Sequence, residues 1–498
     1  MSKAIKIISL ILIINVGASI DITANDYKFG SYAVGFKSYF TYDESRQYLL
    51  EEDTIPRPLQ VYFWYPSQDG SGAKELNFKS YIDLLAQGDD FKRSKDQIDE
   101  HSFSFVKAYT NHAKRNYGLD TSISTHNFLD HPVHAVQGIP IPESSEFPLL
   151  IYVSSDGKAS PQNHLLCEYL ASHGFMIISV ATARPFSSKG KDIESNALTQ
   201  VADMEYLIKF CKDSMQIHYS KLGLFGFSSG GDAIAIYQMR NEHVDAILSM
   251  DGGQEYSSFL KMYKMKDFDL SKTDVPYCSL VNNYENYSIY PYYNSVITKE
   301  KYLFKMPHLT HNGFISYWQF FDACSSIRTK NDMIASFEIL SECSLGFFSK
   351  YLKSEPSLFD SKYQKSTSTV YIQTVDLEQT LINGLNISLL NGNFRLAESI
   401  VEDNKELLFG DRSQVDLLGR ICLSLRPDLA VWLYKKSVNV HPNAWSAHYG
   451  LGGAYKNTGD LILAKKELLM AKELNPEHEG IKKALNELES VNIPLKIQ

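Results

Sequence analysis

The sequence predicts an α/β fold with a doubly wound, mostly parallel sheet, followed by a small all-α domain. Three observations support this prediction. Strand-like and helix-like segments alternate from about residue 27 to about residue 360, a pattern typical of parallel strands joined by crossover helices. A glycine-rich sequence connects one of these strands to the next helix. From about residue 372 to about residue 490 the pattern is helical and repeats with a fixed spacing.

The size and charge of the chain exclude some classes of function. Its 498 residues are too many for a single small module. Lys and Arg number 49 against 58 Asp and Glu, a formal net charge of −9. Because no block of basic residues could follow a phosphate backbone, we expect no nucleic-acid partner. No segment after the N-terminus approaches the roughly 20 apolar residues of a membrane span, so we expect no transmembrane span in the mature protein.

The first 18 residues have the pattern of a secretory signal peptide. Two lysines precede an apolar run at residues 7–14, and a Val-Gly-Ala sequence ends at Ala18. The apolar run is too short to cross a membrane. No cysteine precedes Cys167, so the mature N-terminus would have no residue for a lipid anchor. We therefore expect a cleaved signal peptide at residues 1–18 and a secreted or periplasmic protein.

The predicted α/β-type domain covers residues 27–360. Its strands read as continuous apolar runs, as expected where a parallel strand is buried on both faces. The predicted strands are Leu59–Tyr65, Leu149–Val153, Phe175–Val180, Lys221–Phe225, Ala246–Met250, Pro276–Asn282 and Tyr302–Met306. Two helices are predicted between them, Asn163–His173 and Ala197–Cys211. Residues 67–145 are polar and lack this rhythm, so we expect an elaboration over one edge of the sheet or over the mouth of the site.

The histidines and cysteines predict neither a metal site nor a disulfide framework. His126, His131 and His134 lie close together in the elaboration, and imidazole is a common metal ligand. Scattered loop histidines are the simpler interpretation, so we predict no metal and no cofactor. Six cysteines without a C-x-x-C pair permit one or two disulfides but require none, and buried free thiols are the expected state.

The C-terminal segment contains a 34-residue repeat. The following pairs of positions have this spacing: Ala430 and Ala464, Tyr434 and Leu468, Ser437 and Ala471, Pro442 and Pro476. This is the period of tetratricopeptide repeats. A looser copy begins near Gly392. We expect residues 372–490 to form about three tetratricopeptide-like hairpins, which would bind a protein or peptide, self-associate, or pack on the α/β domain.

The most informative sequence is GFSSGG, residues 226–231, between an apolar strand and a helical segment. A G-x-S-x-G sequence in this context is typical of a nucleophile elbow. The elbow forces a strained backbone at the serine, and glycine neighbours avoid clashes with the adjacent strand and helix. Ser228 is therefore the candidate nucleophile. The alternative interpretation is an ordinary glycine-rich turn.

A serine nucleophile needs a base and an acid that orients it. Two histidines follow the last predicted strand, and we prefer His311 to His308 because it begins the segment that leads toward the next helix. Asp251 directly follows the strand next to that of Ser228, at the edge where open α/β sheets form sites. Glu285, after the following strand, is the alternative acid.

An oxyanion hole would use two backbone N–H groups. One is expected from Ser229, directly after the nucleophile, and the other from the loop at residues 154–158, with Gly157 as the candidate.

Several segments between residues 28 and 355, about two thirds of the chain, resemble the α/β-hydrolases grouped with the plasma-type platelet-activating factor acetylhydrolases, and more broadly the dienelactone hydrolase-like esterases. The segments are GSYAVGF (30–36), DESR (43–46), RPLQVYFWYP (57–66), YLASHGFMIISV (169–180), GFSSGG (226–231) and THNGF (310–314). The resemblance implies ester hydrolysis. It also favours Asp251 over Glu285 as the acid and His311 as the base.

Two positions depart from the family pattern. Asp156-Gly157 stands where the family usually has His-Gly in the oxyanion loop, and Phe227 stands where a histidine usually precedes the nucleophile. Because a carboxylate beside a developing oxyanion would oppose its charge, we expect Asp156 to point away or the site to be retuned.

The sequence therefore predicts a secreted serine hydrolase, most simply a carboxylic ester hydrolase acting on a small-molecule or lipid ester through a Ser228-His311-Asp251 triad and an acyl-enzyme. One alternative is an inert domain of the same fold that acts as a binding or scaffold protein through its repeats. The other is an amidase or peptidase, since the same triad cleaves amides.

Overall fold

The computed structural model describes most of the chain. The described stretches are residues 28–50, 52–87, 91–117, 128–142, 147–155, 160–181, 193–256, 268–282, 290–298, 300–306, 308–316, 331–355 and 426–489, with 262, 265, 371–372, 399, 419 and 422–423. The predicted signal peptide, residues 1–18, lies outside them.

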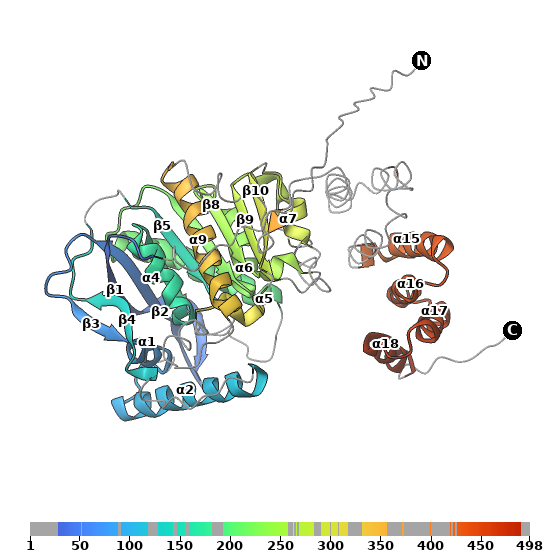
Figure 1. The fold of residues 1–498 in the computed structure, drawn as a ribbon, viewed down its shortest axis with the longest axis horizontal. Coiled ribbons are helices and arrows are strands. Elements are labelled where there is room, and N and C mark those ends of the chain that lie inside the picture. The colour runs from blue at the N-terminus through green and yellow to red at the C-terminus, as the bar shows by residue number, and fades with distance from the viewer. Residues whose placement is uncertain are drawn as a thin grey trace, which may run out of the picture.

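The larger part of the molecule is built on one sheet of eleven strands, in the order β11-β10-β9-β8-β7-β5-β6-β2-β1-β4-β3 (Figure 1). Six central strands are parallel: β5 (Leu149–Val153), β6 (Met176–Ala181), β7 (Leu222–Phe227), β8 (Ala246–Met250), β9 (Tyr277–Asn282) and β10 (Lys301–Met306). The chain crosses from β6 over β5 to β7, so the direction of winding reverses there. This strand order is that of the α/β-hydrolase fold, and it confirms the predicted fold class.

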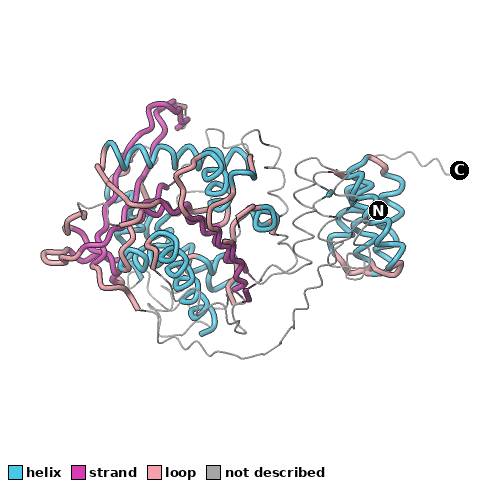
Figure 2. Tube along the Cα trace, turned by 90° about the horizontal axis from the view of Figure 1, so that it is seen from above, coloured by secondary structure: helices cyan, strands magenta, loops and turns pink. Residues whose placement is uncertain are grey.

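Helices cover both faces of the sheet, as the prediction of a doubly wound fold requires (Figure 2). One face packs against α4 (His164–Ser172) and α9 (Asn331–Leu352). The other face packs against α5 (Ile193–Asp213) and α6 (Ser229–Arg240). Every side chain of β5 is buried, because alternate residues point into the two cores. The apolar run that predicted this strand thus reflects burial from both sides.

The first two strands form a long antiparallel ribbon. β1 (Ala33–Leu50) pairs along its length with β2 (Asp53–Ser67), and β2 pairs antiparallel with β6. The register of the ribbon shifts between Asp43 and Gln47. The sequence predicted only the middle of β2, because the residues at its start and much of β1 are exposed or half-buried and give no apolar run.

The polar segment at residues 67–145 lengthens one edge of the sheet. It contains β3 (Lys74–Asn77), α1 (Phe78–Leu85), α2 (Lys95–Tyr117) and β4 (Pro132–Gln137). β4 pairs parallel with β1, and β3 pairs antiparallel with β4. Of the three histidines in this segment, His126 lies outside the described residues. Within the described residues, no three or more His, Cys, Asp and Glu side chains form a group that could hold a metal ion.

The C-terminal part is a series of antiparallel helices, α15 (Pro427–Val440), α16 (Trp445–Thr458), α17 (Leu461–Leu474) and α18 (Glu479–Glu489). Successive helices contact each other. α15 and α17 begin 34 residues apart, as do α16 and α18. A Cβ atom on Gly452 would lie 2.7 Å from the side chain of Leu468, so this glycine lets α16 and α17 approach closely. Most of the predicted first hairpins, before residue 426, lies outside the described residues.

Five of the six cysteines are buried free thiols, and Cys324 lies outside the described residues. In the described part of the chain, no helix combines the length and the apolar character needed to traverse a membrane.

Candidate active site

Ser228 stands at the turn between β7 and α6, with φ 55° and ψ −123°. A positive φ is uncommon for a residue with a side chain and persists only where the surroundings impose it. Three backbone hydrogen bonds do so here. Ser228 N–H donates to the Met250 carbonyl at 3.2 Å, and its own carbonyl accepts from the N–H groups of Gly231 and Gly253 at 2.9 and 2.8 Å.

The glycines around Ser228 are required by close backbone contacts. A Cβ on Gly226 would lie 2.5 Å from the Gly230 carbonyl oxygen. A Cβ on Gly230 would lie 2.1 Å from the carbonyl oxygen of Val153. Both distances are too short for any side chain, which explains the spacing of the motif in physical terms.

The structure brings Ser228, His311 and Asp251 together. The Ser228 hydroxyl lies 3.0 Å from Nε2 of His311, and Nδ1 of His311 lies 2.6 Å from Oδ2 of Asp251. His311 begins the short helix η5 (His311–Phe314) after β10, and its side chain is 45% exposed. The ring of Phe227 packs beside that of His311, with centroids 4.9 Å apart. His308 is exposed, and His311 is the residue that meets Ser228.

Asp251 is fully buried and follows β8, where its φ is 47°. Its Oδ1 accepts from the Tyr256 hydroxyl at 3.0 Å and the Asn282 N–H at 3.1 Å. Its Oδ2 accepts from the Asn282 side-chain amide at 2.8 Å, besides His311. Neither Asn282 nor Tyr256 is predicted as a site residue from the sequence. The available signal for Asn282 was a polar residue ending an apolar strand, and Tyr256 gave none.

Among the other predicted site residues, Ser229 lies in a described part of the chain and two do not. Glu285, the alternative acid, and Gly157, the oxyanion candidate, lie outside the described residues, as does Asp156. Ser229 is the first residue of α6, so its backbone N–H lies in the first turn of this helix. On the β5 side, the Ser154 carbonyl accepts from the side-chain amide of Gln200 at 2.9 Å.

Buried hydrogen bonds join the His311 segment to the chain that follows the β5 loop. The Ser316 hydroxyl donates to Oδ1 of Asn163 and to the Gln162 carbonyl, with both distances 3.1 Å. It also accepts from the Leu165 N–H at 3.2 Å. The segment that carries the base is therefore joined to η1 (Ser160–Asn163).

A second buried carboxylate, Glu255, lies four residues after Asp251. It accepts from the Tyr277 hydroxyl, from the Ser279 hydroxyl at 3.3 Å and from the Tyr293 N–H at 3.2 Å. Burial nevertheless raises the pKa of Glu255 to about 7. Tyr292 and Tyr293 are buried beside Tyr277, so both belong to the core.

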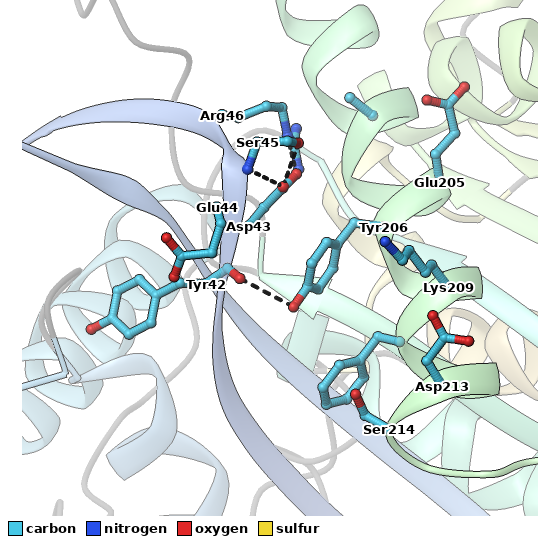
Figure 3. A pocket seen from close by; sticks show the side chains of 12 residues that line it. Tyr42, Asp43, Glu44, Ser45, Arg46, Glu205, Tyr206, Lys209, Asp213 and Ser214 are labelled. Atoms are coloured by element: carbon cyan, nitrogen blue, oxygen red, sulfur yellow. Dashed lines mark hydrogen bonds and ion pairs between the residues drawn. The ribbon is translucent and has the colours of Figure 1, made fainter.

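A surface pocket of about 560 Å³ lies between β1 and α5 and shares no residue with the triad (Figure 3). On the β1 side, Arg46 pairs with Asp43 at 2.5 Å and with Asp203 at 2.7 Å. On the α5 side, the Tyr206 hydroxyl donates to the Tyr42 carbonyl at 3.3 Å. These contacts fasten the ribbon to α5, so we assign the pocket no part in catalysis.

No protein-family model matches the chain, and no curated protein matches it. Among solved structures, a ferulic acid esterase from Streptomyces cinnamoneus is similar, with 16% sequence identity and a TM-score of 0.49. The match covers 69% of this chain and 97% of the esterase chain. The assignment of the α/β-hydrolase fold rests on this chain's own strand order and elbow.

Proposed function

We propose that this protein is a serine hydrolase that cleaves carboxylic esters. The observation that supports the proposal most directly is the hydrogen-bonded series from the Ser228 hydroxyl through His311 to the buried Asp251 carboxylate, with distances of 3.0 and 2.6 Å. The strained backbone at Ser228 supports it further, because strain of this kind exposes the nucleophile of an elbow.

In the proposed mechanism, Ser228 Oγ attacks the ester carbonyl carbon while Nε2 of His311 takes the hydroxyl proton. Asp251 holds Nδ1 and stabilises the imidazolium. The oxyanion is bound by the backbone N–H of Ser229 and by one from residues 154–158, for which Gly157 is the candidate. His311 then gives its proton to the leaving alcohol. A water molecule, deprotonated by His311, then attacks the carbonyl carbon of the acyl-Ser228 ester. His311 returns this proton to Ser228 Oγ as the acyl bond breaks, which releases the acid and restores the free enzyme.

The resemblance to the acetylhydrolase and dienelactone hydrolase-like esterases favours an ester over an amide. Esters have a better leaving group, so an ester and an amide with the same acyl group separate the two possibilities. We therefore propose a small-molecule or lipid ester as substrate. The enzyme should hydrolyse 4-nitrophenyl acetate and longer acyl esters faster than the 4-nitroanilides with the same acyl groups.

Labelling with a fluorophosphonate probe tests the nucleophile without a known substrate. We expect the wild type to be labelled, and Ser228→Ala to lose labelling while keeping its thermal unfolding temperature. Ser214→Ala, an exposed serine at the end of α5, is the matched control and should label normally. A folded wild type that is not labelled would instead favour an inert domain that acts through its repeats.

Hydrolysis of 4-nitrophenyl acetate compares the two candidate acids, Asp251 and Glu285. Asp251→Asn keeps the shape of the side chain but leaves His311 without a carboxylate, and we expect kcat to fall by roughly three to four orders of magnitude. Glu285→Gln should retain most of kcat. A larger loss in Glu285→Gln would reverse the assignment of the acid.

Export and the role of the repeats remain predictions from the sequence. We propose that residues 1–18 are removed during secretion, which the N-terminal mass of the protein recovered outside the cytoplasm would test. The C-terminal unit is proposed to be tetratricopeptide-like because its helix starts recur at 34 residues.

A further inference from the structure

The Asp251 carboxylate has more partners than a triad needs. Its two oxygens accept four hydrogen bonds, and only one of them comes from His311. Two oxygens of an ionised carboxylate offer about four acceptor positions. The remaining donors are supplied by Asn282, through both its backbone and its side chain, and by Tyr256.

We propose that Asn282 and Tyr256 are positioning residues that hold the Asp251 carboxylate in the plane that meets His311. Asn282 ends β9, and its backbone N–H reaches Oδ1 while its side-chain amide reaches Oδ2, so one residue fixes both oxygens. The same amide lies 3.2 Å from the Tyr256 hydroxyl, which links the two donors to each other. This role rests on the proposed hydrolase function.

Because Asp251 and Asn282 lie in the protein interior, the loss of one donor should have a large effect. Asp251 is fully buried and Asn282 is 7% exposed, so water has little access to replace a lost donor. A buried polar group that loses its partner is costly. Uncharged donors also share the negative charge of the carboxylate without competing with His311 for a proton. Among the described residues, the titratable groups that hydrogen-bond to Asp251 are His311 and Tyr256.

Removing a donor should act through the orientation of the base. The carboxylate becomes free to rotate away from Nδ1, so fewer molecules hold His311 in the reactive orientation. Because the donors do not touch the substrate site directly, we expect kcat to fall while KM stays nearly unchanged.

The experiment measures 4-nitrophenyl acetate hydrolysis and fluorophosphonate labelling on the full chain. Asn282→Ala should lower kcat by about 10- to 100-fold, and Tyr256→Phe by a smaller factor, with KM nearly unchanged. Tyr206→Phe, which removes a hydroxyl distant from the triad, is the matched control and should behave as the wild type. Labelling rates are corrected for the folded fraction from thermal unfolding.

An Asp251→Ala background separates positioning from other roles. If Tyr256 acts through Asp251, Tyr256→Phe should slow labelling in the wild type but cause no further loss in Asp251→Ala. Equal losses in both backgrounds, or an unchanged kcat in both single variants of an active enzyme, would overturn the proposal. An unlabelled wild type would instead contradict the proposed function itself.

Discussion

Glu168 is a fully buried carboxylate in α4, on the face of the sheet that packs against α4 and α9. It accepts from the Tyr81 hydroxyl at 2.7 Å and from the His134 N–H at 3.2 Å. Burial raises the pKa of Glu168 to about 7. Burial, and after it the charge of ionised Glu168, raises the pKa of Tyr81 and of the adjacent Cys167 thiol. The neighbouring His164 is kept neutral by burial, which lowers its pKa to about 3.

The raised pKa of Glu168 predicts a loss of stability with rising pH. The folded state keeps its proton up to about pH 7, whereas the unfolded chain releases it near 4.5. The contribution is thus fully present below pH 4.5 and is lost as pH rises to 7, by about 3 kcal/mol in the free energy of unfolding. Glu168→Gln resembles the protonated form and should flatten this dependence in urea unfolding between pH 5 and 8.

Glu205→Gln is the matched control, because Glu205 is exposed on α5. Its unfolding free energy should follow the wild-type pH dependence. If Glu168→Gln also follows the wild type, the Glu168 carboxylate is stabilised in its ionised form by its donors and the prediction is wrong.

Single residues differ in how far the sequence can reveal them. Ser228 and its glycines are neighbours in the chain, so their shared constraint appears as a motif. Asp251 could be proposed because parallel strands end at one edge of the sheet. Asn282 and Tyr256 could not, because their contacts depend on the exact course of the chain after β8 and β9.

At the scale of elements, buried hydrogen bonds join the segment that follows η5 to η1. Ser316→Ala would remove the hydroxyl that meets Asn163 and Gln162, and leave the fully buried Asn163 oxygen without that donor. We expect the free energy of unfolding to fall by about 1–3 kcal/mol. Labelling by a fluorophosphonate should also slow, because the segment that carries His311 loses its link to η1.

Ser341→Ala provides the control for this connection. Ser341 is equally buried, but its hydroxyl donates to the Phe337 carbonyl one turn earlier in α9. Its loss changes no contact between elements, so labelling should stay at the wild-type rate. If Ser316→Ala also labels at that rate, the connection supports folding alone.

Strands could be predicted from the sequence where all of their side chains are buried. The bounds predicted for β5 and β8 agree with the structure to the residue, because both strands are buried on both faces. β1, β3 and β4 were not predicted as strands. They are the last three strands at one end of the sheet and carry exposed side chains. Their pairing with neighbouring strands, rather than their apolar content, therefore makes them strands.

At the scale of the molecule, the described residues form separate hydrophobic cores. Two lie on opposite faces of the sheet and draw on residues 34–352. The third draws only on residues from 422 onward, with Leu433, Leu451 and Leu468 at its centre. A core that shares no residue with the others can be stable without them. The α/β domain is therefore expected to fold without the helical unit.

The aggregation of an isolated α/β domain should depend on the residue at which the chain is cut. The triad residues all precede residue 312, but β11 (Tyr371–Ile372) pairs antiparallel with β10 at Phe304 and Lys305. A fragment of residues 28–375 keeps this strand. We expect it to be monomeric by size-exclusion chromatography and to react with the fluorophosphonate at the rate of the full chain.

A fragment of residues 28–365 lacks β11 and leaves the edge of β10 unpaired. An exposed strand edge is a template for pairing with other chains, so this shorter fragment should aggregate more readily while its folded fraction still labels. Because both fragments lack the helical unit, a difference between them reports the effect of the edge strand β11. If both fragments aggregate and bind a hydrophobic dye, residues beyond 375 cover apolar surface of the α/β domain, and the two parts form one folding unit.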